Sequence, residues 1–186
     1  MKIFISGGCK NGKTYHAQRL AKAQENGGGL YYVATMKPVD REDEDRIENH
    51  RRQRSGWGFS TVEQPFNVED VLRKCDKKGS FLLDSVTALL ANEMFGGSRI
   101  NEGAGEETLK GLTRLINNID NIVIVSDYIY SDASPYGHLT EKYRKTLAEI
   151  DCAIAKNCDV VLETAYTNII VHKGEEVFGG LNEKML

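Results

Sequence analysis

The chain has 186 residues, of which 40% are hydrophobic and 27% are charged, the balance of a compact globular protein rather than of a disordered one. Its formal net charge of −3 provides no broad basic field, which argues against nucleic acid as a partner. The apolar runs are shorter than the roughly 20 residues that span a bilayer, so we expect no membrane span. The N-terminus lacks a signal-peptide pattern, and the sequence predicts one cytoplasmic domain over residues 1–186.

The first 35 residues are predicted to form a β-α-β unit around a glycine-rich loop. A β-rich run covers residues 2–6, and apolar residues then recur at helical spacing over 13–25. Consecutive glycines at 27–29 end this helix, and an aromatic and β-branched run follows over 30–35. The loop therefore lies between a strand and a helix, within the length that such units usually have.

The loop from Gly7 to Thr14 matches the phosphate-binding pattern G-x-x-x-x-G-K-[ST] in full. Its backbone amides and the following helix N-terminus are suited to hold phosphates. Lys13 is expected to reach the outer phosphates and Thr14 to ligate Mg²⁺. The predicted nucleotide-binding residues of the loop are Gly7, Gly8, Cys9, Lys10, Asn11, Gly12, Lys13 and Thr14.

Residues 41–54 are predicted to form a helix whose acids come first and whose bases come last, which suits the helix macrodipole. Ile47, His50, Arg51 and Arg54 have the spacing that places them on one face. Guanidinium groups beside an imidazole could bind phosphates and keep the ring neutral, so that it could attack phosphorus. The alternative is a solvated charged helix with an incidental histidine.

A strand over 59–63, a helix over 68–77 and a buried strand over 81–84 follow, and the helical pattern resumes over 85–95. Asp84 ends the buried strand, the place where phosphate-loop proteins hold magnesium with a carboxylate. Asp84 could instead cap the helix that follows, and the two roles are compatible.

The second half continues the alternation of helices and strands. Helices are predicted over 106–119 and 139–156 and strands over 122–125 and 160–163, and residues 168–172 follow to form a terminal hairpin or an edge pair. This pattern predicts a mostly parallel sheet that is covered on both faces. The loop at 128–138 carries Tyr128, Tyr130 and Tyr136 near Asp127 and Asp132, and it could be an acceptor lid or a subunit contact.

Several segments together resemble the bifunctional adenosylcobinamide kinase/adenosylcobinamide-phosphate guanylyltransferases. The similarity covers about residues 1 to 95 well. The segments that carry it are Ile5-Ser6-Gly7-Gly8, Gly12-Lys13-Thr14, Tyr32-Val33-Ala34-Thr35, Arg46-Ile47 with His50-Arg51, Arg54, Trp57, Glu63 and Leu82-Leu83-Asp84.

The resemblance implies an α/β, P-loop NTPase-type three-layer fold with a mostly parallel central sheet, and a homotrimer. It implies phosphorylation of adenosylcobinamide with ATP or GTP, then transfer of GMP from GTP through a guanylyl-histidine at the position of His50. The corrinoid is thus the acceptor and Mg²⁺ the cofactor. The implied guanine-nucleotide site comprises Thr35, Met36, Lys37, Arg51, Arg52, Gln53, Arg54, Glu63 and Asp84.

The sequence departs from the family pattern in its second half. Ser126-Asp127-Tyr128 stands where the family usually has Ser/Thr-Asn-Glu, and Glu149-Ile150-Asp151 stands where it commonly has Arg-Val-Asn. The resemblance therefore supports the guanylylation step more strongly than the kinase step. A simpler phosphate-loop kinase or NTPase, and a noncatalytic nucleotide-binding module, are the alternative functions.

Overall fold

The computed structural model describes residues 1–38 and 41–182, without the side chains of Glu42, Asp43, Arg46, His50, Gln53 and Asn182. A seven-stranded sheet in the order β3-β2-β4-β5-β1-β6-β7 forms its centre. All neighbouring strands are parallel except β6 and β7. The strands are β1 (Lys2–Gly7), β2 (Leu30–Ala34), β3 (Ser60–Glu63), β4 (Ser80–Asp84), β5 (Asn121–Asp127), β6 (Val160–Ala165) and β7 (Asn168–Lys173).

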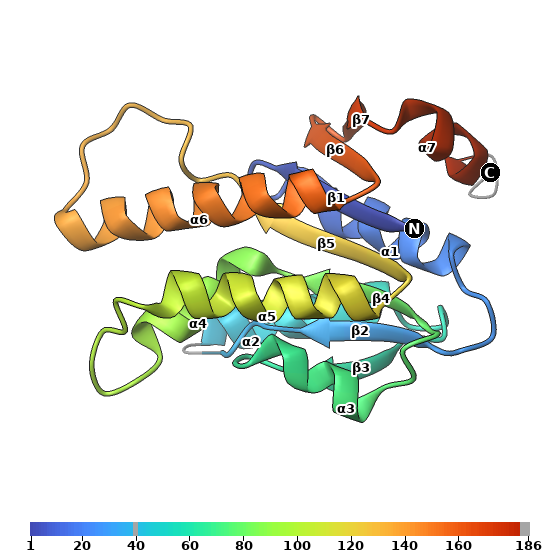
Figure 1. Cartoon of the computed structure of the whole chain (residues 1–186), viewed down its shortest axis with the longest axis horizontal. Coiled ribbons are helices and arrows are strands. Elements are labelled where there is room, and N and C mark those ends of the chain that lie inside the picture. The colour runs from blue at the N-terminus through green and yellow to red at the C-terminus, as the bar shows by residue number, and fades with distance from the viewer. Residues whose placement is uncertain (39–40, 183–186) are drawn as a thin grey trace.

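Helices cover both faces of the sheet, which confirms the three-layer prediction. In Figure 1, α5 and α6 cross in front of the sheet and α1 lies behind it. The helices are α1 (Lys13–Ala23), α2 (Arg41–Gln53), α3 (Val71–Lys74), α4 (Val86–Phe95), α5 (Ala104–Asn118), α6 (His138–Asn157) and α7 (Glu175–Asn182), with a 3₁₀ turn at Val68–Asp70. Among these described helices, none has both the length and the apolarity needed to cross a membrane.

The alternation of side chains along the strands divides the core into two parts. On β1, Phe4 packs into the cluster that α4, α5 and α6 cover. Its neighbours Ile3 and Ile5 pack on the other face, with apolar residues of α1 and α7. Both clusters are buried, as expected for parallel strands that helices cover on both sides.

The predicted elements agree with the structure except in two helices. The helix predicted over 68–77 ends at Lys74, because Asp76 starts a turn: its carbonyl accepts from the Gly79 amide at 3.0 Å and its side chain from the Lys78 amide at 3.0 Å. Helix α7 was not predicted from the sequence, and its Phe178 and Leu181 complete the core over β1 and β6. Strands β6 and β7 form the predicted edge hairpin.

Candidate nucleotide site

The phosphate loop joins β1 to α1 at the carboxyl edge of the sheet, where parallel α/β sheets bind ligands. Its shape depends on glycine: a Cβ atom on Gly7 would lie 2.5 Å from the carbonyl oxygen of Thr164, and Gly12 has a φ of 93°. The Asn11 side-chain amide also donates to the Thr164 carbonyl. The loop is therefore held against β6, while Cys9 and Lys10 are exposed.

Lys13 is buried beneath the loop, with only 5% of its surface exposed. Its Nζ donates to the carbonyl oxygen of Gly8 at 2.6 Å and forms an ion pair with Asp127 Oδ1 at 2.6 Å. Asp127 lies opposite Gly7 in the parallel pairing of β5 with β1. A lysine fixed at this place offers its charge to phosphates that the loop would bind. This pair was not predicted, because the two residues are far apart in the sequence.

Thr14 and Asp84, the two residues predicted from the sequence to hold magnesium, meet next to Lys13. Thr14 Oγ1 donates to Asp84 Oδ2 at 3.3 Å, and the Tyr32 hydroxyl donates to the same oxygen at 2.6 Å. Burial and the nearby carboxylate raise the pKa of Tyr32 well above its usual value. Hydroxyl and carboxylate oxygens are ligands that Mg²⁺ prefers, so this donor set fits the ion. The capping role considered for Asp84 is wrong, since Ser85 caps α4 by accepting from the Ala88 amide.

A second group of predicted residues lies at the end of α2. The guanidinium of Arg54 lies 4.0 Å from the centre of the Tyr32 ring, and its Nη2 donates to Thr61 Oγ1 at 3.1 Å. Only 7% of Arg54 is exposed, and this burial lowers the pKa of its guanidinium. Arg54 contacts Tyr32, Tyr32 binds Asp84, and Asp84 binds Thr14. This chain of contacts connects α2 with the phosphate loop.

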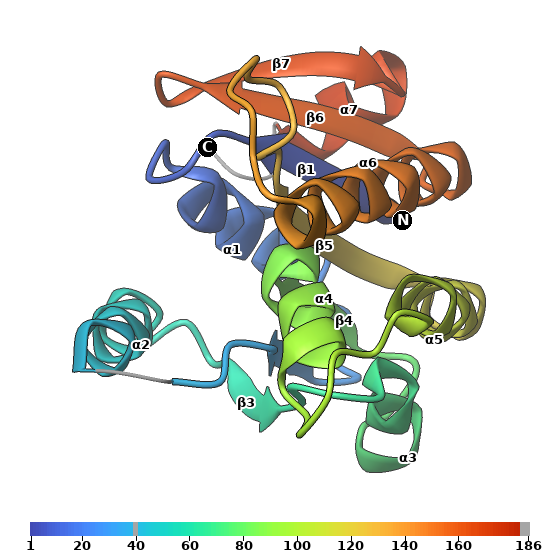
Figure 2. The same ribbon diagram turned by 90° about the vertical axis from the view of Figure 1, so that its left-hand side faces the viewer.

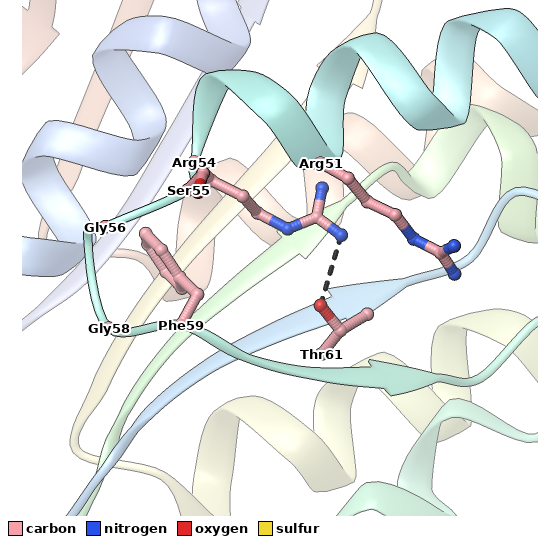
Figure 3. A pocket seen from close by; sticks show the side chains of 7 residues that line it. All are labelled: Arg51, Arg54, Ser55, Gly56, Gly58, Phe59 and Thr61. Carbon is pink, nitrogen blue, oxygen red and sulfur yellow. Dashed lines mark hydrogen bonds between the residues drawn. The ribbon is translucent and has the colours of Figure 1, made fainter.

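An open pocket of about 470 Å³ lies beside Arg54. Figure 3 shows the Arg54 side chain directed toward Thr61, whereas the Arg51 side chain extends away from Thr61. Arg51 forms an exposed ion pair with Glu63 at 2.9 Å. Both arginines line the pocket. It is lined by Arg51, Arg54, Ser55, Gly56, Gly58, Phe59 and Thr61.

The remaining predicted site residues have different surroundings. The hydroxyl of Thr35 is buried between the backbone carbonyl and amide of Ser85, at 2.7 Å from each, so it ties β2 to the start of α4. Met36 is half-buried and Lys37 exposed. Arg52 donates to Asn49 on the same helix at 2.7 Å. The other two, His50 and Gln53, belong to α2, and their side chains lie outside the described residues.

A buried acid lies behind the phosphate loop, where α6 packs against β5. Asp151 Oδ2 accepts hydrogen bonds from Ser126 Oγ at 2.9 Å and from the Tyr130 hydroxyl at 3.0 Å. Burial above all, with the charge of Asp127, raises the pKa of Asp151 to about 7. Both segments that depart from the family pattern thus meet at this acid. Its burial was not predicted, because one acid in an amphipathic helix has no local signal for it.

The loop that precedes α6 is anchored at several points. Arg144, which is buried, donates to the carbonyl oxygen of Ile129 at 2.9 Å and pairs with Asp132 Oδ1 at 3.0 Å. Tyr130 points to Asp151, while the Tyr128 hydroxyl donates to Glu163 Oε1 at 3.2 Å. Part of this loop is therefore packed against α6 and β6.

Residues 3–167 match the family model described as cobinamide kinase / cobinamide phosphate guanyltransferase. The chain is also 31% identical over 102 residues to the bifunctional adenosylcobalamin biosynthesis protein CobU of Escherichia coli (strain K12), a match that covers 53% of this chain and 54% of that protein. The match thus spans about half the length of that relative.

Solved structures with a similar trace include the flagellar accessory protein FlaH of Methanocaldococcus jannaschii, with a TM-score of 0.45 and 17% identity over 92% of this chain and 77% of that one. A KaiC-like protein of the hyperthermophilic archaeon Pyrococcus horikoshii gives a TM-score of 0.46 and 15% identity over 92% of this chain and 78% of that one.

Proposed function

This chain belongs to the cobinamide kinase / cobinamide phosphate guanyltransferase family, and we propose that it carries out both reactions of that description. It phosphorylates adenosylcobinamide with ATP or GTP, then transfers GMP from GTP to the new phosphate and yields adenosylcobinamide-GDP. The observation that carries the proposal is the contact chain from Thr14 through Asp84 and Tyr32 to Arg54. It joins a phosphate loop to the end of the helix that holds His50.

In the kinase step, the acceptor hydroxyl oxygen attacks the γ-phosphorus, the bond to the β,γ-bridging oxygen breaks so that the nucleoside diphosphate leaves, and the hydroxyl proton passes to solvent water. Lys13 stabilises the charge on the transferred group, because its ammonium is held at the loop by the carbonyl oxygen of Gly8. A Mg²⁺ ion held by Thr14 and Asp84 would neutralise phosphate charge when bound.

In the guanylylation step, a ring nitrogen of His50 attacks the α-phosphorus of GTP, and pyrophosphate leaves as the bond to the α,β-bridging oxygen breaks. A phosphate oxygen of the acceptor then displaces the histidine and takes the GMP. Arg51 and Arg54 line the same pocket, and their positive charges suit the leaving pyrophosphate.

The test is incubation of the chain with α-labelled GTP. We expect acid-labile, base-stable label on the protein, lost in His50→Ala and kept in His138→Ala, a histidine change at the start of α6. Adding phosphorylated cobinamide should discharge the label. Label that persists in His50→Ala would overturn the histidine mechanism. Turnover of γ-phosphate without covalent GMP would favour a simple kinase, and binding without turnover a noncatalytic module.

The single domain over residues 1–186, the homotrimer and the cytoplasmic location remain predictions. Sedimentation of the purified chain would test the trimer. The chemistry proposed for the two steps does not depend on these three predictions.

A further inference from the structure

The turn between β6 and β7 lies against the phosphate loop, and the proposed chemistry does not use it. His16, in the first turn of α1, has its Nε2 2.9 Å from the carbonyl oxygen of Thr167. A Cβ atom on Gly12 would lie 3.7 Å from Thr167 Cγ2. In Figure 2 this turn and α2 lie on opposite sides of the start of α1. The turn is thus fixed at the edge of the loop that is remote from α2.

The residues of this turn are unusual for its shape. Tyr166 and Thr167 connect the two strands with φ angles of 50° and 67°. Two-residue turns with positive φ at both positions strongly prefer Asn-Gly, because bulky and β-branched residues are strained there. Tyr166 is nevertheless 92% exposed, so burial of its ring does not compensate the strain. Strained residues of this kind cluster at functional sites.

The site also fixes the direction in which a bound nucleotide runs. Lys13 is paired with Asp127 at the end of β5, and Thr14 with Asp84 at the end of β4. These groups mark where the outer phosphates and the metal belong. Both strands lie on one side of β1 in the sheet order, whereas β6 and β7 lie on the other. A nucleotide whose outer phosphates face β4 and β5 extends its nucleoside toward the turn.

We propose that Tyr166 is the stacking platform for the purine base of the nucleoside triphosphate that the phosphate loop holds as the phosphoryl donor of the kinase step. The ring face binds adenine and guanine alike, because stacking requires only a π surface. This site is separate from the pocket at Arg54. It rests on nucleotide binding by the loop and is independent of the corrinoid acceptor.

The experiment compares the dissociation constants of ATP, GTP and inorganic tripolyphosphate, each with Mg²⁺, for the wild type and for Tyr166→Asn. Asparagine suits positive φ, so the variant should unfold at the same or a higher temperature than the wild type. Its affinity for both nucleotides should fall about 10-fold, near the low end for one lost stack, while tripolyphosphate binds unchanged. Tyr166→Phe should restore nucleotide affinity, and Ile170→Ala on β7 controls for changes in the hairpin.

Two results would overturn the proposal. Equal losses for nucleotides and tripolyphosphate would mean that the turn only shapes the phosphate loop, and unchanged affinities would place the base elsewhere. A wild-type chain that binds none of the three ligands would remove the nucleotide site, and the stacking site with it. Failure to phosphorylate cobinamide, with these affinities as expected, would count only against the proposed function.

Discussion

The phosphate loop and helix α2 carry the two halves of the proposed chemistry, and they are held in different ways. The loop is fixed between β1, β5 and β6, and its lysine is buried against Gly8 and Asp127. Figure 2 shows α2 standing apart from the sheet. At the C-terminal end of α2, Arg51 reaches Glu63 and the following Arg54 reaches Tyr32. The lysine of the loop is thus held in place before any ligand binds, and Arg51 and Arg54 join the C-terminal end of α2 to β3 and β2.

Because the phosphate loop lies in front of the buried Asp151, the free energy of unfolding of the protein should depend on pH through this acid. The pKa of this acid is raised to about 7, above the value of about 3.9 expected in the unfolded chain. Between these values the folded state retains a proton that the unfolded state has lost, so stability falls as pH rises through this window. Asp151→Asn should therefore be more stable than the wild type at pH 8, by up to about 4 kcal/mol, with the difference shrinking toward pH 4.

Urea unfolding at several pH values measures this difference. The exposed Asp120→Asn serves as the control for loss of one carboxylate at the surface. A difference between Asp151→Asn and the wild type that stays constant from pH 4 to pH 8 would contradict the account of the buried acid.

Replacing Lys13 should lower nucleotide affinity more than any change at α2. Lys13→Ala deletes a charge-assisted contact to phosphate, so we expect about a 100-fold loss of nucleotide affinity. Titration calorimetry with tripolyphosphate and with GTP would show the loss for both ligands. Lys22→Ala, at the exposed end of the same helix, should bind as the wild type does; a similar loss there would indicate general damage to α1.

The anchoring of the C-terminal end of α2 can be tested by replacing Arg51 and Arg54 separately. Arg54→Ala removes a buried contact with the Tyr32 ring and a hydrogen bond to Thr61, and should lower the free energy of unfolding by about 2 kcal/mol. Arg51→Ala breaks only an exposed ion pair, which is worth about 0.5 kcal/mol. Chemical denaturation of both variants gives the comparison. Equal effects would mean that burial of Arg54 does not anchor the helix.

The smallest expected effect concerns Asp127. Its carboxylate competes with phosphate for Lys13, so Asp127→Asn should bind tripolyphosphate more tightly, by about 5-fold, through loss of like-charge repulsion. Weaker binding in the same titration would show instead that Asp127 positions the lysine for the ligand.

The predictable parts of this molecule are those whose signal is local. The phosphate loop is contiguous from Gly7 to Thr14, and the strand that ends at Asp84 is a continuous apolar run, so both were predicted together with the sheet. The Lys13–Asp127 pair was not predictable, because it depends on the register between β1 and β5, more than 110 residues apart. The burial of Arg54 depends similarly on how α2 returns to β3, which no spacing within the helix reveals.

If one chain combines a phosphate loop with covalent chemistry on α2, the guanylylated residue must lie on that helix, and mass spectrometry can locate it. The chain would be incubated with GTP and Mg²⁺ without acceptor, digested under alkaline conditions and analysed by mass spectrometry. We expect one GMP on the peptide that contains residues 41–54, attached to His50. A GMP on another residue, or an unmodified protein that still transfers GMP to phosphorylated cobinamide, would contradict it.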